Sequence, residues 1–106
     1  MSSSRCSVRL LPIAEEDLLD IVSYVAADDV GAALSLADRF EKNLLKLSSF
    51  PFLGRTPNDA KLTRLGYRFL VVGSYLIFYK VRGKTALVHR IIHGARDLEN
   101  LSFEER

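Results

Sequence analysis

The stretch from Tyr67 to His93, YRFLVVGSYLIFYKVRGKTALVHRIIH, is the part of the chain from which the fold is most readily inferred. It contains three runs rich in β-branched and aromatic residues, which predict strands at residues 67–72, 75–81 and 85–93. Gly73-Ser74 separates the first two runs, and Arg82-Gly83-Lys84 separates the second two. Short loops that contain glycine join antiparallel neighbours. The stretch therefore predicts three consecutive antiparallel strands.

The residues ahead of this stretch are spaced for two helices. Pro12 follows a short β-type run at residues 8–11 and suits the first turn of a helix. Apolar residues then recur at spacings of three and four, first over residues 14–25 and again over residues 33–47. Asp28-Asp29-Val30-Gly31 is expected to end the first helix, and the second should run from about residue 32 to residue 48. Helices joined by so few residues lie antiparallel as a hairpin.

Together these elements predict an α+β fold. Their order is β-α-α-β-β-β, and we expect a small antiparallel sheet packed against an N-terminal helical hairpin. Residues 55–66 are polar and are expected to form a loop. A length of 106 residues suits a single modest core, so residues 1–106 are expected to form one domain.

The composition excludes several classes of protein. Cys6 is the only cysteine, which rules out a disulfide framework or a cysteine-based zinc cluster within the chain. A free thiol fits a reducing compartment, and no apolar run approaches the ~20 residues that cross a bilayer. Residues 1–5 are not followed by an apolar segment of the signal-peptide type. We therefore expect a cytoplasmic protein that does not enter a membrane.

Charge is distributed unevenly, although the net charge is only +2. Residues 14–29 are acidic, whereas residues 55–96 carry nine Lys and Arg side chains against a single acid, Asp59. This asymmetry favours an anionic partner, either a nucleic acid or an acidic polypeptide. The alternative is a sheet whose basic residues only keep its edges solvated.

The end of the last predicted strand concentrates the candidate functional residues. Residues 88–97 hold two histidines and two arginines. His89 and His93 share a strand face but lie ~13 Å apart, too far to bind one ion, so no metal site is expected. No phosphate-binding glycine loop is present, and no cofactor is expected. In a regular strand Arg90 lies on the face of Val88, opposite His93, so a site that uses both needs a bulge.

Each candidate also has a purely structural interpretation. Arg90 would pair with a helix carboxylate or extend to the sheet edge, and His93 would close the end of the sheet through backbone hydrogen bonds. Arg96, which follows Gly94, and Arg68, near the start of its strand, are the other cations that would face a partner. The sequence leaves both interpretations open.

Several stretches, taken in chain order, point to one known family. They are Ala14–Ile21 with Tyr24, Phe50–Arg55, Gly66–Arg68, Tyr75–Tyr79 and Arg90–Asp97. Together they resemble the RelE/ParE toxin superfamily of bacterial type II toxin–antitoxin modules. The superfamily fold, a small antiparallel sheet against a helical hairpin, agrees with the element order derived above. The resemblance implies a cognate antitoxin, encoded beside the toxin, that neutralises it in a hetero-oligomer.

The superfamily implies two activities. RelE-like members cleave mRNA in the ribosomal A site without a metal, whereas ParE-like members poison DNA gyrase. RelE-type nucleases carry an arginine directly after the first tyrosine of the central strand, where this chain has Leu76. They also place a tyrosine or histidine near the C-terminus, and the tail after Asp97 has neither. We therefore expect a ParE-like gyrase poison; a RelE-like ribosome-dependent mRNA endonuclease and a non-toxic binding module of the same fold are the alternatives.

The site residues follow from this resemblance. If the protein is a nuclease, His93 would act as acid or base, and Arg96 and Arg68 would stabilise the transition-state charge. If it acts by binding, the expected partner-binding residues are Arg68, Arg90, His93, Arg96, Leu18 and Phe40. An antitoxin segment in a helix-in-groove contact would use the apolar hairpin positions and shield the basic end of the sheet.

Overall fold

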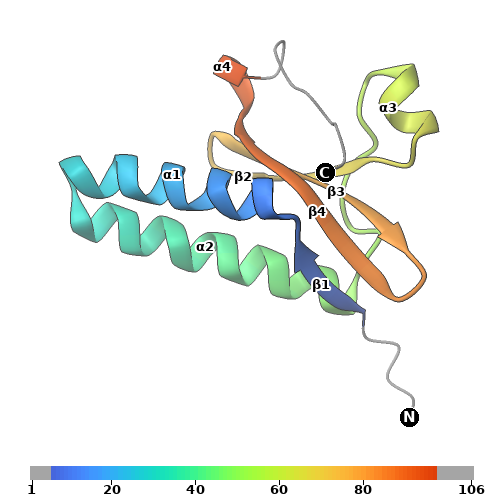
Figure 1. The fold of residues 1–106 in the computed structure, drawn as a ribbon, viewed down its shortest axis with the longest axis horizontal. Coiled ribbons are helices and arrows are strands. Elements are labelled where there is room, and N and C mark those ends of the chain that lie inside the picture. The colour runs from blue at the N-terminus through green and yellow to red at the C-terminus, as the bar shows by residue number, and fades with distance from the viewer. Residues whose placement is uncertain (1–5, 98–106) are drawn as a thin grey trace.

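The structure, a computed structural model, describes residues 6–97 of the chain. Two long helices, α1 (Pro12–Asp28) and α2 (Val30–Ser49), lie side by side against a four-stranded sheet (Figure 1). The strands are β1 (Ser7–Leu10), β2 (Arg68–Val72), β3 (Tyr75–Arg82) and β4 (Thr85–His93). Two short helices are α3 (Ala60–Arg64) and α4 (Gly94–Asp97). The predicted α+β fold with an N-terminal helical hairpin is confirmed.

The strands lie in the order β1-β4-β3-β2. The pairs β2–β3 and β3–β4 are antiparallel, and Gly73 and Gly83 adopt the positive φ values, 59° and 58°, of their tight turns. The sheet is nevertheless mixed, because β1 pairs parallel with β4. The chain passes from β1 to β4 through both helices and two strands, so no tight turn forces these two strands to be antiparallel.

The two long helices meet at a single residue, Asp29. Its N–H donates to the Val25 carbonyl at 2.8 Å, and its carboxylate accepts a hydrogen bond from the Ala32 N–H at 3.0 Å. One aspartate therefore ends α1 and caps α2. The break expected over residues 28–31 is shorter than predicted, because Val30 and Gly31 already belong to α2. Within residues 6–97 no helix is both long and apolar enough to cross a membrane.

Residues 55–66, expected to form a loop, contain the short helix α3. Asp59 caps it by accepting a hydrogen bond from the Leu62 N–H at 3.0 Å. A helix of one turn has no apolar periodicity for a sequence pattern to reveal. Ahead of α3, Arg55 and Phe69 exchange backbone hydrogen bonds of 2.8 and 2.9 Å, which attach the segment to β2.

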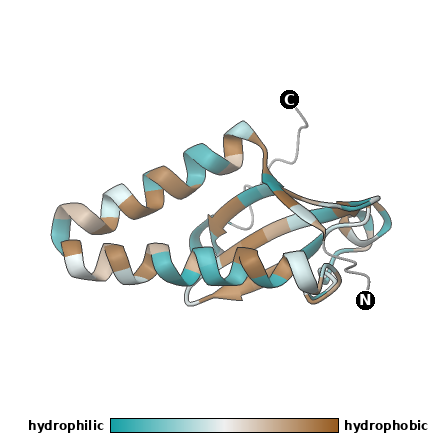
Figure 2. Ribbon diagram, turned by 90° about the horizontal axis from the view of Figure 1, so that it is seen from below, coloured by the Kyte–Doolittle hydropathy of each residue, from teal (hydrophilic) through white to brown (hydrophobic). Residues whose placement is uncertain are grey.

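The core lies between the helical hairpin and the sheet. In Figure 2 apolar ribbon segments, in brown, recur along both helices and along the strands beside them. The main buried cluster consists of Ala14, Phe40, Leu47, Leu70, Val72, Ile77, Tyr79, Ala86, Val88 and Ile91. Phe40 and Leu47 are the large buried side chains of α2, so the helical spacing identified the buried side of this helix correctly.

Strand β4 contains a bulge at His89. Two successive residues of β3 pair with Arg90 and Val88, so His89 is an extra residue in β4. The alternation of faces is therefore offset, and Val88 and Ile91 both belong to the core cluster although they are three residues apart. The expectation that Arg90 shares a face with Val88 is wrong, because it assumed a regular strand.

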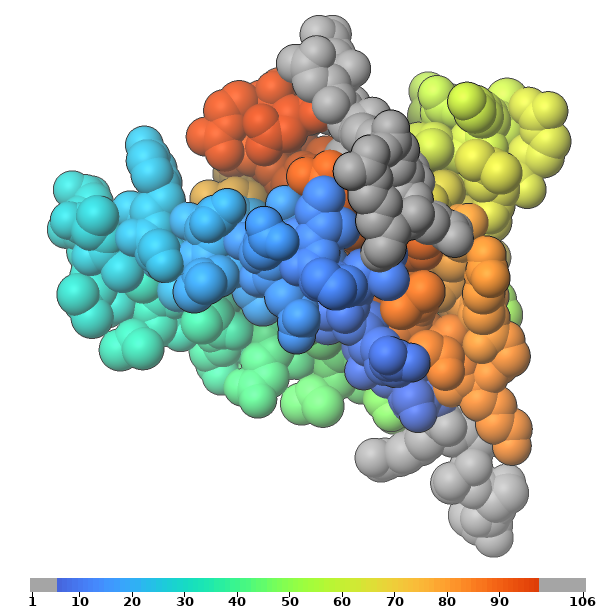
Figure 3. All heavy atoms as spheres, viewed as in Figure 1, coloured from blue at the N-terminus to red at the C-terminus, as the bar shows by residue number. Residues whose placement is uncertain are grey.

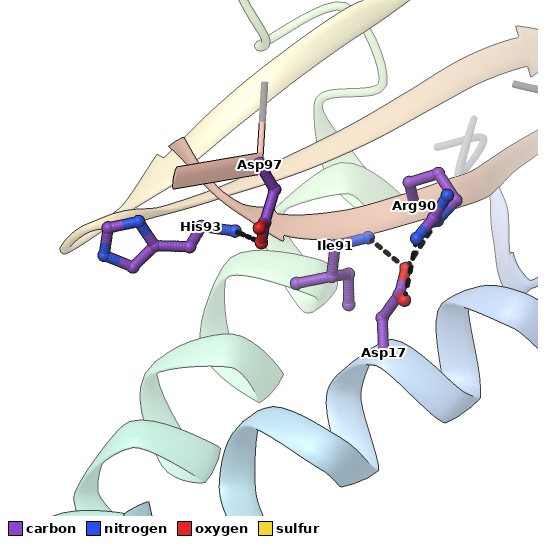
Figure 4. Close-up of polar contacts among 5 residues, drawn as sticks. All are labelled: Asp17, Arg90, Ile91, His93 and Asp97. Carbon is purple, nitrogen blue, oxygen red and sulfur yellow. Dashed lines mark hydrogen bonds and ion pairs between the residues drawn. The ribbon is translucent and has the colours of Figure 1, made fainter. Parts of the chain in front are cut away.

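Helix α1 is attached to the edge of β4 that β1 leaves open. β1 pairs with β4 only as far as Val88. Beyond that point, Asp17 of α1 accepts hydrogen bonds from the Ile91 N–H at 3.0 Å and from Arg90 Nε at 2.8 Å (Figure 4). Arg90 Nη2 donates to the other carboxylate oxygen at 3.1 Å. One carboxylate thus accepts a backbone N–H beyond the end of the β1 pairing and neutralises a partly buried guanidinium.

Glycine is required at position 54, where the chain returns from α2 to the sheet. The Gly54 N–H donates to the buried Tyr79 hydroxyl at 2.8 Å. A Cβ at this position would lie 2.7 Å from the Tyr79 ring and hydroxyl, and 2.9 Å from the Phe69 carbonyl oxygen. The backbone therefore approaches the core more closely than any side chain would permit.

Asp17→Ala is expected to lower the free energy of unfolding by about 2–4 kcal/mol, because Arg90 and the Ile91 N–H lose this acceptor in a partly buried site. Urea unfolding should show a lower midpoint with an unchanged slope. Asp38→Ala is the matched control, since Asp38 forms an exposed ion pair with Lys42 at 2.9 Å and should leave the midpoint unchanged. Equal midpoints for the two variants would contradict the role assigned to Asp17.

Gly54→Ala is expected to lower the free energy of unfolding by about 1–3 kcal/mol, because its methyl group displaces Tyr79 or the backbone of β2. Gly31→Ala serves as the control. At Gly31 the nearest atom to a Cβ is Asp29 Oδ1 at 3.4 Å, and the residue lies in α2, so alanine should be neutral or stabilising. Thermal unfolding of both variants checks this, and an unchanged melting temperature for Gly54→Ala would disprove the close packing.

Candidate functional site

The six predicted partner-binding side chains lie in three separate places. Arg90, His93 and Arg96 are at the C-terminal end of β4 and in α4. Leu18 and Phe40 lie between the two long helices, and Arg68 begins β2. The structure therefore does not gather them into one site.

A hollow of about 430 Å³ opens between α1 and the end of β4. Its lining is Asp17, Asp20, Ile21, Tyr24, Tyr75, Arg90, Ile91, Ile92, Arg96 and Asp97. Because the acidic first helix packs beside the basic strand, charges of both signs meet here. The end of β4 is consequently less basic than the linear distribution of charge suggests.

His93 closes the turn between β4 and α4. Its ring meets the Tyr75 ring edge to face, with centroids 5.4 Å apart, and its Nδ1 accepts a hydrogen bond from the Arg96 N–H at 3.2 Å. Since Nδ1 accepts, the proton of the neutral imidazole lies on Nε2. The ring points away from the Asp17–Arg90 pair (Figure 4).

Asp97 attaches α4 to the strand. Its carboxylate accepts a hydrogen bond from the His93 N–H at 3.2 Å and forms an ion pair with Arg96 Nε at 3.3 Å. Burial raises the pKa of Asp97, but the His93 N–H and the Arg96 guanidinium outweigh it, so the pKa lies below its ordinary value. The two bonds hold Arg96 at the mouth of the hollow.

The two arginines at this end differ in accessibility. The Arg96 side chain is 63% exposed, whereas that of Arg90 is 21% exposed. The hydrogen bond to Asp17 raises the pKa of Arg90 although burial opposes it. Arg90 therefore stabilises the fold, and Arg96 is the more available of the two for a partner.

Arg68 lies at the other end of the sheet and holds the loop that follows α2. Its Nη1 donates to the carbonyl oxygens of Phe52 at 3.3 Å and of Gly54 at 3.0 Å. Its Cζ lies 5.2 Å from the centre of the Phe52 ring. Burial raises the pKa of the nearby Tyr79 hydroxyl, while the Gly54 N–H and the Arg68 guanidinium oppose that shift. Arg68 is thus a positioning residue for this loop.

The three proposed nuclease residues do not converge. Arg68 pairs with Tyr79 of β3, whereas His93 pairs with Tyr75, four residues earlier in the same strand. Four residues of strand span ~13 Å, and Arg68 and His93 also lie on strands separated by β3. Metal-free cleavage needs acid, base and cation around one phosphate. In the described part of the chain, no three His, Cys, Asp or Glu side chains gather to hold a metal ion either.

A second hollow, of about 690 Å³, lies between α1, α2 and β1, and we name it the hairpin groove. It is lined by Val8, Leu10, Glu15, Leu18, Leu19, Val22, Ala37, Phe40, Glu41, Leu44 and Leu45. Leu19 and Leu45 are 66% and 64% exposed, whereas Phe40 is 1% exposed. Phe40 can therefore meet a partner only at the floor of the groove. Figure 3 shows α1, α2 and β1 on one continuous face.

Sequence reasoning anticipated that Arg90 could pair with a helix carboxylate, and the structure identifies this carboxylate as Asp17. It missed a buried cluster in which the Tyr67 hydroxyl and His89 Nδ1 lie 3.3 Å apart. Lys80 Nζ lies 4.5 Å from the centre of the Tyr67 ring. The partners in these three contacts are 13 to 73 positions apart in the chain, so no local spacing identifies them.

Comparisons with known proteins bear on the family of this fold. The family model described as the ParE toxin of the type II toxin–antitoxin system parDE matches residues 8–98. The chain is similar to the structure of the chromosomal ParDE toxin–antitoxin system from P. aeruginosa, with 20% identity and a TM-score of 0.70 over 86% of this chain and 98% of that chain. It is also similar to the RelBE2 toxin–antitoxin complex from Mycobacterium tuberculosis, with 21% identity and a TM-score of 0.56 over 84% and 91%. No curated protein matches it by sequence.

The two structural likenesses support the fold, and the family model supports more than the fold. Its match runs from β1 through both helices and the β2–β4 unit to α4. These are the elements that carry the stretches resembling the RelE/ParE superfamily. The chain therefore belongs to the ParE toxin family of type II toxin–antitoxin systems.

Proposed function

We propose that this protein is a ParE-like toxin that poisons DNA gyrase by binding it, and that a cognate antitoxin neutralises it in a hetero-oligomer. The separation of Arg68 from His93 and Arg96 is the observation that carries the proposal. Poisoning by binding needs an exposed surface, whereas phosphodiester cleavage needs a convergent acid, base and cation. The family description, a toxin of a toxin–antitoxin system, supports the general class.

The RelE-like mRNA endonuclease remains the alternative, because the RelBE2 complex has a similar fold. Two observations weigh against it. Leu76 stands where those nucleases carry an arginine, and it packs beside α4, 3.4 Å from the position of a Cβ on Gly94. His93 Nδ1 is occupied by the Arg96 N–H and is not placed to act as a base.

The hairpin groove suits a helical segment of the antitoxin. Both similar structures are described as toxin–antitoxin systems, which supports a protein partner of this kind. The charged residues in the groove lining are Glu15 and Glu41. The segment that lies there should therefore be apolar with basic flanks, while an acidic segment of the antitoxin covers Arg96.

The purified protein is expected to inhibit supercoiling by gyrase and to leave mRNA on programmed ribosomes intact. Arg96→Glu should weaken this inhibition by about tenfold or more, because it reverses a charge at the accessible end of β4. Titration of both proteins in a supercoiling assay with a cleavage-complex readout, run beside an mRNA cleavage assay, measures these effects.

Lys84→Glu is the matched control for this experiment. Lys84 is an exposed cation in the β3–β4 turn, at the other end of β4, and its reversal changes the net charge equally. The Lys84→Glu variant should inhibit gyrase as the wild type does. Cut mRNA with normal supercoiling would replace the proposal with the nuclease, and inactivity in both assays would identify a non-toxic binding module.

Leu45→Glu is expected to weaken antitoxin binding by about tenfold or more while leaving gyrase inhibition unchanged, because it places a charge in an apolar groove. Leu45 is 64% exposed, so the fold tolerates the change. Calorimetric titration with the antitoxin encoded beside the toxin measures the affinity. Leu34→Glu is the control, since Leu34 is 69% exposed and does not line the groove. Equal affinities for the two variants would rule out this binding mode.

A further inference from the structure

The loop at residues 50–55, which we name the Phe52 loop, is fixed to the sheet by three independent contacts. Arg68 donates to the carbonyls of Phe52 and Gly54, and the Gly54 N–H donates to Tyr79. Arg55 exchanges two backbone hydrogen bonds with Phe69 of β2. A short surface loop attached in this way has lost its conformational freedom before it meets any partner. Such preorganisation favours affinity.

The fixed loop presents apolar side chains to solvent. Phe52 is 62% exposed, and its neighbours Phe50 and Leu53 are 64% and 49% exposed. The Arg68 guanidinium lies over the Phe52 ring and orients it while one face of the ring stays accessible. Single exposed apolar residues are ordinary, but three within four consecutive residues on a rigid loop indicate an interaction surface.

The charge around the loop indicates what kind of partner it fits. The Arg68 guanidinium lies over the Phe52 ring, and the loop itself carries the exposed cation Arg55. Residues 50–55 contain no acidic residue. The surface is therefore apolar with cations beside it. It complements an apolar pocket with an acidic rim.

We propose that Phe52 is the anchor by which this toxin docks on its target protein, entering an apolar pocket with an acidic rim on gyrase. This inference rests on the proposed function and adds a second contact with gyrase to the one expected at Arg96. A protein fits better than a single-stranded nucleic acid, because Leu53 has no face on which a base stacks. In addition, Arg68 is already engaged by two carbonyls and a ring and is not placed to bind phosphate.

The Phe52 loop is distinct from the proposed antitoxin site. The described residues that line the hairpin groove come from β1, α1 and α2, and none belongs to residues 50–55. The loop pairs through Arg55 with β2, at the opposite edge of the sheet from β1. Variants of Phe52 should therefore separate target binding from antitoxin binding.

The test is a comparison of Phe52→Ala with wild type in three titrations of the full chain: against gyrase, against the cognate antitoxin, and against a labelled single-stranded oligonucleotide. We expect the affinity for gyrase to fall by about thirtyfold or more, the typical effect of truncating an aromatic anchor, with antitoxin affinity unchanged. Phe52→Leu should recover part of the loss. Leu34→Ala, a truncation at an exposed apolar residue of α2, should bind gyrase as the wild type does.

The outcomes separate this inference from the proposed function. If the wild type binds gyrase and Phe52→Ala binds it equally well, the inference is wrong and the proposed function stands. If the wild type does not bind gyrase, both are wrong. If Phe52→Ala loses oligonucleotide binding while keeping its gyrase affinity, the loop is a nucleic-acid surface and the inference is overturned. A melting temperature of Phe52→Ala equal to that of the wild type confirms that truncating this exposed side chain leaves the fold intact.

Discussion

The Asp17 carboxylate is the contact on which the arrangement of helices and sheet depends. β1 has only four residues, so the second half of β4 has an edge that β1 does not cover. An open edge exposes backbone N–H groups to pairing with other chains. Asp17 accepts the Ile91 N–H and neutralises Arg90, so one side chain covers the edge and fixes α1 to the sheet. Helix α2 has attachments of its own, because Ser48 and Cys6 exchange hydrogen bonds and Phe40 and Leu47 lie in the core.

Because of the Asp17–Arg90 contact, the arginines of β4 and α4 have different roles. Arg90 pairs with Asp17, while Asp97 holds the more exposed Arg96 at the mouth of the hollow. The charge pattern along the chain does not distinguish these two arginines. In the folded protein only the accessible one offers its charge to a partner, because a paired and partly buried guanidinium would have to break its bonds first.

The proposed partners are distributed over surfaces of different chemistry. The hairpin groove is apolar with two acidic residues, whereas the Phe52 loop is apolar with the cations Arg55 and Arg68. The motif at residues 50–55 was visible in the sequence as part of a family resemblance. Its physical role was not, because the contacts of Arg68 and Tyr79 with this loop join residues 14 to 25 positions apart.

The amino-acid sequence predicts the element order, the antiparallel β2–β4 unit, the helical hairpin and the family, because these follow from local spacing, turn residues and short motifs. Only the folded structure shows the parallel pairing of β1, the bulge at His89, the choice of Asp17 as the partner of Arg90 and the distance between Arg68 and His93. Each of these depends on residues distant in the chain that meet only when the helices pack on the sheet. A local sequence pattern does not reveal such contacts, because the free energy that stabilises them is gained only when distant elements pack together.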